Sequence, residues 1–89
     1  MMDSDEIKSR VLHKLARQRR WGGKHTSFEN LQKGFPSHLA KDVKVVGKGL
    51  VKEGLLLSKP TGYGLEICLN PRMKKEIIAI IEKYFKKDY

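Results

Sequence analysis

The chain has 89 residues, of which 39% are hydrophobic and 33% are charged, so one small folded domain is expected rather than a disordered chain. No apolar run approaches the ~20 residues of a membrane-spanning helix, and the acidic start is unlike a signal peptide. We therefore expect a single cytoplasmic domain over residues 1–89. The net charge of +9 favours a polyanionic partner, nucleic acid before a membrane surface.

Residues 3–20 are predicted to form the first helix. Asp3 and Glu6 have the spacing of a capping box, and three arginines stand near the other end, where positive charge suits the helix dipole. The buried stripe of this helix consists of Ile7, Val11 and Leu15. Two glycines end the helix, and Trp21 is expected to cover its end as part of the core.

A second, shorter helix is predicted to begin with Thr26 as its N-cap and Glu29 at the third position, and to end at Gly34. Residues 24–25 before it are expected to form a short strand. Phe28 and Leu31 should face the core. A helix, a glycine-containing turn and another helix over residues 26–54 match the helix-turn-helix unit.

The helix predicted over residues 37–53 has two faces of opposite character. Its apolar stripe consists of Leu39, Val43, Val46 and Leu50. Its other face carries Ser37, Lys41, Lys44, Lys48 and Lys52 without an interleaved acid. Two interior glycines each cost about 1 kcal/mol relative to alanine, although Gly47 beside the stripe would admit close packing. A rival reading makes residues 42–46 a strand, but the valines there do not keep a period of two.

A hairpin is predicted over residues 55–69, with strands at 55–58 and 65–69 and a turn at 59–64. The second strand alternates strictly, which places its inward residues at Leu65, Ile67 and Leu69. Glu66 and Cys68 are expected to face outward.

Asn70 and Pro71 predict the start of a last helix that runs to residue 87. Its apolar residues cover more than one face. The surplus set of Ile78, Ile81 and Phe85 would be exposed on a monomer, and we predict a homodimer through this helix. In the alternative, the first helix and the hairpin cover both apolar sectors.

No pattern of catalytic or metal-binding residues stands out. The histidines and the single cysteine lack ligand spacing, and each is expected to be a surface or capping residue: His13, His25, His38 and Cys68. Nucleophile-elbow and Walker patterns are missing from the sequence, and no carboxylate pair stands out. We expect no enzymatic activity, no cofactor, no metal and no small-molecule ligand.

Taken together, the predicted elements form an α+β fold, mainly α, of the winged helix-turn-helix type, with three helices, a two-stranded wing hairpin and a C-terminal helix. In such a fold helix 37–53 lies in the major groove of duplex DNA, and the wing at residues 59–64 lies on the backbone or in the minor groove. Lysine contacts to phosphate or to guanine edges are then expected, and Val45 would contact a thymine methyl group. The predicted DNA-binding residues are Ser37, His38, Lys41, Lys44, Val45, Lys48, Lys52, Lys59, Thr61, Tyr63, Lys24, His25 and Thr26.

The segment KHTSFENLQKGFPSHL, followed by LVKEGLLLSKPTGYGLEICLNPR, resembles the small stand-alone winged-helix proteins common in archaea. The resemblance runs from about Lys24 to Arg72, a little over half the chain. It implies a DNA-binding fold and a role in transcription. We also expect the protein to associate with the nucleoid. Two alternatives stay open, a winged helix that binds protein within a larger assembly and an RNA-binding protein.

Overall fold

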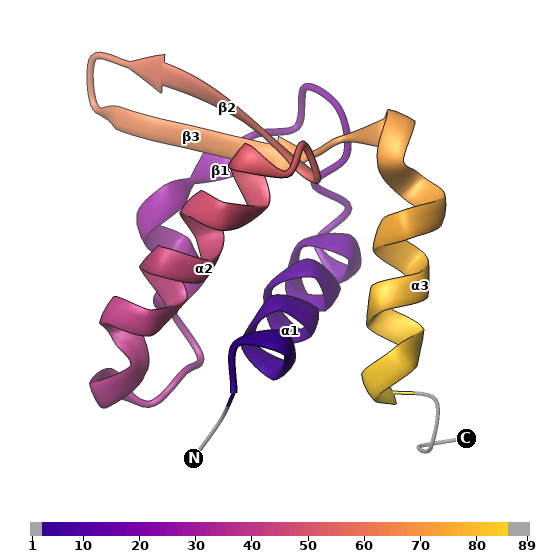
Figure 1. Cartoon of the computed structure of the whole chain (residues 1–89). Helices are drawn as coiled ribbons and strands as arrows, with labels where there is room; N and C mark the ends of the chain where they lie inside the picture. The colour runs from indigo at the N-terminus through magenta and orange to yellow at the C-terminus, as the bar shows by residue number, and fades with distance from the viewer. Residues whose placement is uncertain (1–2, 86–89) are drawn as a thin grey trace.

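The computed structural model describes residues 3–85, with only the main chain at residue 85, and this part is an α+β structure that is mainly helical (Figure 1). Its α-helices are α1 (Ser4–Arg17), α2 (Ala40–Lys52) and α3 (Lys74–Phe85). Its strands are β1 (Thr26–Ser27), β2 (Leu56–Thr61) and β3 (Gly64–Leu69). Short 3₁₀ helices are η1 (Phe28–Gln32), η2 (Ser37–Leu39) and η3 (Pro71–Met73). None of the helices in this part of the chain combines the length and hydrophobicity that crossing a membrane requires.

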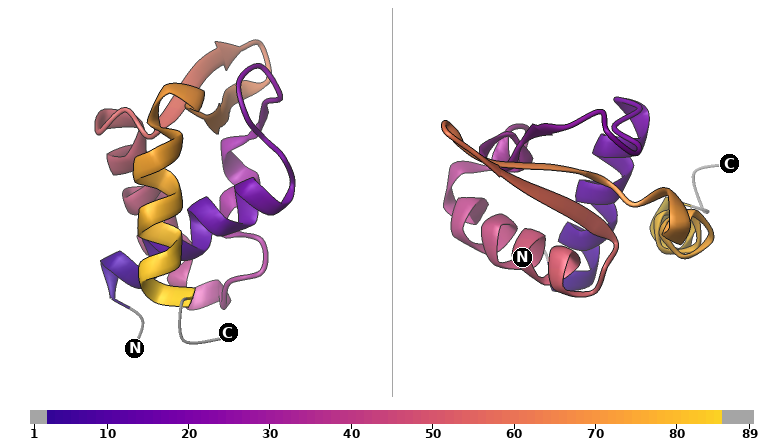
Figure 2. Two further views of the ribbon diagram at one scale, coloured as in Figure 1. Left: turned by 90° about the vertical axis from the view of Figure 1, so that its right-hand side faces the viewer. Right: turned by 90° about the horizontal axis from the view of Figure 1, so that it is seen from above.

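The three strands form one antiparallel sheet with β3 in the centre, in the order β1-β3-β2. The long pairing runs from Leu56 opposite Leu69 to Thr61 opposite Gly64. Helix α1 packs against both α2 and α3, so it lies between them beneath the sheet (Figures 1 and 2).

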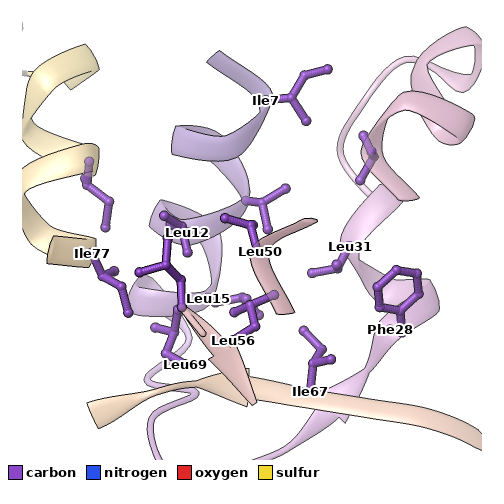
Figure 3. Close-up of a cluster of buried hydrophobic side chains, with 14 of the residues drawn as sticks. Ile7, Leu12, Leu15, Phe28, Leu31, Leu50, Leu56, Ile67, Leu69 and Ile77 are labelled. Carbon is purple, nitrogen blue, oxygen red and sulfur yellow. The ribbon is translucent and has the colours of Figure 1, made fainter. Parts of the chain in front are cut away.

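One hydrophobic core joins the helices to the sheet, as Figure 3 shows. Side chains from the helices, such as Leu12 and Leu50, point toward Leu56 and Leu69 of the hairpin. Burying each aliphatic side chain of this size contributes about 1.5–3 kcal/mol to folding. The predicted stripes of α1 and α2 are confirmed, since the buried residues include Ile7, Val11, Leu15, Leu39, Val43 and Leu50, with Val46 partly buried.

Helix α1 begins as predicted and ends earlier. The Asp3 side chain accepts a hydrogen bond of 2.8 Å from the Glu6 backbone N–H, which caps the first turn. The helix stops at Arg17 rather than at residue 20, because Arg19 has a positive φ of 56° that a helix cannot contain. Trp21 packs partly buried against the core, as expected.

The segment that follows is built differently from the prediction. The short strand is Thr26–Ser27 instead of residues 24–25, and Thr26 pairs with Ile67 of β3. Because Thr26 is taken into the sheet, the N-cap passes to Ser27, whose side chain accepts from the Glu29 N–H at 3.2 Å. The helix that it opens is the 3₁₀ helix η1, and Gly34 after it adopts the expected positive φ, 90°.

Residues 37–52 are helical, so the rival strand at residues 42–46 is wrong. The segment opens with η2 and continues directly into α2. The close packing expected at Gly47 is confirmed, because a Cβ there would lie 2.8 Å from Leu31 Cδ1 and 3.0 Å from Phe28 Cε1. The glycine therefore lets η1 approach α2.

The hairpin is confirmed, but its turn is tighter than predicted. Strand pairing continues through Lys59 and Pro60 to Thr61, and only Gly62 and Tyr63 form the turn. Residues 59–61 are therefore part of a regular strand.

The prediction that Cys68 faces outward is wrong, because Cys68 is 0% exposed. The alternation rule assumes that one face of a strand is open to water. Here the end of β3 lies between β2 and residues 20–22, the segment that follows α1. Leu69 of β3 donates to the Arg20 carbonyl at 2.7 Å and accepts from the Gly22 N–H at 3.1 Å. The consecutive residues Ile67, Cys68 and Leu69 are all fully buried, so both faces of β3 are covered at this end and the thiol is enclosed.

Asn70 starts the last helical segment as predicted and also joins three parts of the fold. Its side chain accepts from the Arg72 N–H at 3.1 Å and donates to the Gly54 carbonyl at 2.8 Å. Its backbone N–H donates to the Leu55 carbonyl at 3.0 Å. The residue therefore ties the start of α3, through η3, to the end of α2.

Part of the predicted dimer surface belongs to the core. Ile81 is 8% exposed and packs in the hydrophobic core, so its place in a surplus apolar set is wrong. It lies four residues after the buried Ile77, and both face α1, which covers this sector of α3. Ile78 is half-buried on another side of the helix, and the Phe85 side chain lies outside the described residues.

Candidate nucleic-acid interface

The outer face of α2 and η2 presents a straight row of exposed side chains. They follow the spacing three, four, three, four, which keeps them on one side of the helix. Val45 in the middle of the row is 63% exposed, a high value for an aliphatic residue. We call this row the α2 ridge, and its members are His38, Lys41, Val45, Lys48 and Lys52.

Lys44 lies outside this ridge, although the sequence placed it with the other lysines. It is half-buried, and its Nζ lies 3.2 Å from Glu29 Oε2 of η1. The position of Lys44 on the helix turns it toward η1, so part of its charge is offset by a neighbouring carboxylate. Ser37 is exposed at the first residue of η2.

Two acidic residues stand near the ridge, and one of them is paired with a residue of α1. Glu53 follows Lys52 directly, but its Oε1 accepts from Lys8 Nζ of α1 at 2.8 Å, which draws this carboxylate toward α1. Asp42 is exposed beside Lys41. The ridge itself carries three lysines and a histidine with no carboxylate among them.

The β2–β3 hairpin projects past α2, as the views in Figures 1 and 2 both show. Tyr63 at its tip is fully exposed, and Lys59 on β2 is exposed as well. Thr61, which was predicted to contact DNA, forms hydrogen bonds within the hairpin. Its Oγ1 donates to the Gly64 carbonyl at 2.7 Å and accepts from the Tyr63 N–H at 3.2 Å. Its hydroxyl therefore holds the turn that carries Tyr63.

The DNA-binding residues predicted at positions 24–26 do not form a common site. Thr26 is buried in the sheet, and its Oγ1 accepts from Asn30 Nδ2 at 2.9 Å. The His25 ring turns back on the chain, with Nδ1 3.1 Å from the Gly23 carbonyl oxygen. Lys24 is the exposed cation of this segment.

The chain has no significant match to a protein-family model, to a curated protein or to a solved structure. Over residues 3–85, no three His, Cys, Asp or Glu side chains gather as a metal ion would require. Function is therefore inferred from the shape and charge of the surfaces themselves.

A basic groove that the sequence analysis missed lies between α1 and the loop at residues 33–36. Its volume is about 460 Å³. Three of its side chains come from one face of α1, spaced three and four apart, and Lys33 comes from the loop. The spacing of Arg10, His13 and Arg17 was a signal for this surface, but only the fold brings Lys33 to it. We call it the α1 groove.

Lys14 forms one wall of the α1 groove and fastens the loop to α1. Its Nζ donates to the carbonyl oxygens of Asn30 and Lys33, both at 2.6 Å. Burial, and then the positive charge of Lys33, lower the pKa of Lys14 from its ordinary value. The ammonium group is therefore engaged by the backbone, and the loop is held in place beside α1.

Proposed function

We propose that this protein is a winged helix-turn-helix protein that binds double-stranded DNA, with α2 in the major groove and the β2–β3 hairpin as the wing. The order of the elements supports this assignment, because η1 and α2 form the helix-turn-helix unit and a hairpin follows α2 directly. Strand β2 of that hairpin is in contact with α2.

The α2 ridge is the observation that carries the proposal. A helix of this size fits the major groove of B-form DNA, and a row of cations along it meets phosphates and the O6 and N7 atoms of guanine. Val45, exposed between Lys41 and Lys48, supports a base contact, since a thymine methyl group is the apolar partner that the major groove offers.

The hairpin extends this surface. Tyr63 stands fully exposed at its tip, and Lys59 adds a cation along β2. A projecting hairpin with these side chains suits contacts to the sugar-phosphate backbone or to the minor groove.

Affinity in this complex is expected to come mainly from phosphate contacts. The ridge offers lysine, histidine and valine, but none of the arginine, asparagine or glutamine side chains that read bases by paired hydrogen bonds. We propose a regulator of transcription or a chromatin-like binder of modest base specificity, associated with the nucleoid.

Binding to fluorescent duplex DNA, duplex RNA and single strands, measured by anisotropy across a salt series, tests the proposal. The test variant is Lys41→Gln/Lys48→Gln. Lys75→Gln/Lys83→Gln on α3 is the matched control, because it removes the same charge from exposed positions elsewhere. We expect duplex DNA to bind best. The test variant should lose affinity and about 1.8 units of slope in log K against log salt, roughly 0.9 for each phosphate contact.

Equal losses in the two double variants would mean that net charge alone attracts DNA, and the assignment of the α2 ridge would be wrong. Preferred binding of duplex RNA or of single strands would favour the RNA-binding alternative over the proposed function.

A second candidate, a protein-interaction module, has one observation in its favour. Ile78 and Ala79 lie in a shallow, mostly apolar depression on α3, bordered by Lys74, Lys75 and Glu82. A homodimer through this face is compatible with DNA binding, because α3 does not carry the α2 ridge.

A further inference from the structure

The α1 groove concentrates positive charge away from the α2 ridge. Its lining residues come from α1, from Gln18 at the C-cap of α1 and from residues 33–36, and none belongs to α2. The lining includes Arg10, Arg17 and Lys33 but no aspartate or glutamate, and the structure describes all of these residues. Two unit charges of the same sign repel when they lie close together, so such a cluster favours an anion between them.

The cations of the groove differ in how far they are already engaged. Arg10 Nη2 lies 3.0 Å from Glu6 Oε2, one turn earlier on α1. The Lys14 ammonium group donates to two backbone carbonyls. Within residues 3–85, no ion pair joins Arg17 or Lys33 to a carboxylate. These two side chains, one on each side of the groove, are the ones available to a ligand.

The groove also has an apolar wall. Phe35 is half-buried against the core, and Pro36 beside it is exposed. Lys14 holds the start of this loop through the Lys33 carbonyl, and the Phe35 N–H donates to the Gln32 carbonyl at 3.1 Å. Phe35 is therefore presented beside the cations by a loop whose start is fastened to α1.

We propose that the α1 groove binds a nucleotide, a small ligand that joins a phosphate group to a flat aromatic ring. Arg17 and Lys33 hold the phosphate oxygens by charge-assisted hydrogen bonds, and the ring lies against Phe35 and Pro36. The ligand site is separate from the α2 ridge, and the inference does not rest on DNA binding.

Titration of the full chain, followed by the amide signals in ¹H–¹⁵N NMR spectra without DNA, tests the site. The probes are adenosine monophosphate, inorganic phosphate and adenosine. We expect saturable shifts at residues 33–35 with the nucleotide. Phosphate alone should bind about tenfold more weakly, because it lacks the stacking contribution of the base. Adenosine alone, without a charged group, should give no saturable shift.

Arg17→Gln and Lys33→Gln should each weaken nucleotide binding about tenfold, the loss of one charge-assisted contact. Lys75→Gln removes the same charge from α3 and should leave nucleotide binding unchanged. Unchanged positions of the remaining amide signals establish that each variant is folded.

The following results would overturn the proposal. These are shifts confined to the α2 ridge, equal affinity for the nucleotide and for inorganic phosphate, and equal effects of Arg17→Gln and Lys75→Gln. A duplex that shifts residues 33–35 when the nucleotide does not would make the groove a second nucleic-acid contact, which also overturns it. Because no DNA enters the nucleotide titration, failure of the DNA assay and failure of this one are separate results.

Discussion

Lys44 Nζ of α2 lies 3.2 Å from Glu29 Oε2 of η1, so an ion pair joins the two helices of the proposed helix-turn-helix unit. Both side chains are partly exposed, and such pairs contribute little to stability. The pair instead sets the charge of the proposed interface, because it offsets one of the four lysines between residues 41 and 52.

Glu29→Gln is expected to strengthen duplex DNA binding. The change leaves the Lys44 ammonium group without its carboxylate and removes a negative charge close to the DNA phosphates. We expect a two- to fivefold gain in affinity at low salt and a salt slope larger by up to about 0.9. Glu76→Gln on α3 makes the same change in net charge and serves as the control. A weaker complex for Glu29→Gln would show that the carboxylate positions Lys44 for contact.

Two glycines of α2 should respond in opposite ways to replacement by alanine. At Gly49 an added Cβ meets nothing within 4 Å, so Gly49→Ala should stabilise the protein by about 0.5–1 kcal/mol through helix propensity. At Gly47 the Cβ would press on Leu31 and Phe28, an overpacking cost of about 1–3 kcal/mol that outweighs the same gain. Urea unfolding of both variants measures the difference, and a Gly47→Ala protein as stable as Gly49→Ala would contradict it.

The buried thiol of Cys68 gives a third prediction. Because the side chain is fully enclosed, a thiol reagent should label it only when the protein is unfolded by denaturant. Cys68→Ser places a hydroxyl group in the same buried site and should cost about 1–3 kcal/mol of stability. Cys68→Ala controls for the lost volume. Rapid labelling of the folded protein would show that the structure around Cys68 opens readily.

Substitutions at two isoleucines of α3 are expected to have different effects, one on stability and the other on self-association. Ile81→Ala should lower the free energy of unfolding by about 2–4 kcal/mol, because Ile81 is in the core. Ile78→Asp should leave stability nearly unchanged and abolish a dimer, which analytical ultracentrifugation over a concentration series detects. A wild-type protein that stays monomeric at high micromolar concentration would end the dimer hypothesis.

Much of the fold could be read from the sequence because its signals are local. The cap at Asp3, the stripe of residues 39–50, the turn at Gly62 and the cap at Asn70 each depend on a few neighbouring residues. Their predicted conformations are confirmed to within a few residues at the ends.

The errors arose where distant segments decide the outcome. Thr26 was assigned as a cap, but pairing with Ile67, far along the chain, draws it into the sheet. Cys68 was placed outside because alternation along one strand does not report that other parts of the fold cover both of its faces. The candidate interface shows the same difference between local signals and contacts that join distant segments. Spacing along α2 predicted a polar face of which Lys41, Lys48 and Lys52 belong to the α2 ridge. The Lys44–Glu29 pair and the α1 groove depend instead on contacts between elements.

Asn70 links the end of α2, which carries the α2 ridge, to the start of α3, which carries the proposed dimer face. One side chain holds the Arg72 N–H and the Gly54 carbonyl, while its own backbone N–H holds the Leu55 carbonyl. A displacement of α3 on dimerisation would be transmitted through these hydrogen bonds of Asn70 and would shift the end of α2 and the base of the hairpin. Binding at the two surfaces would then be thermodynamically linked, and DNA would tighten the dimer by the same factor by which the dimer tightens DNA.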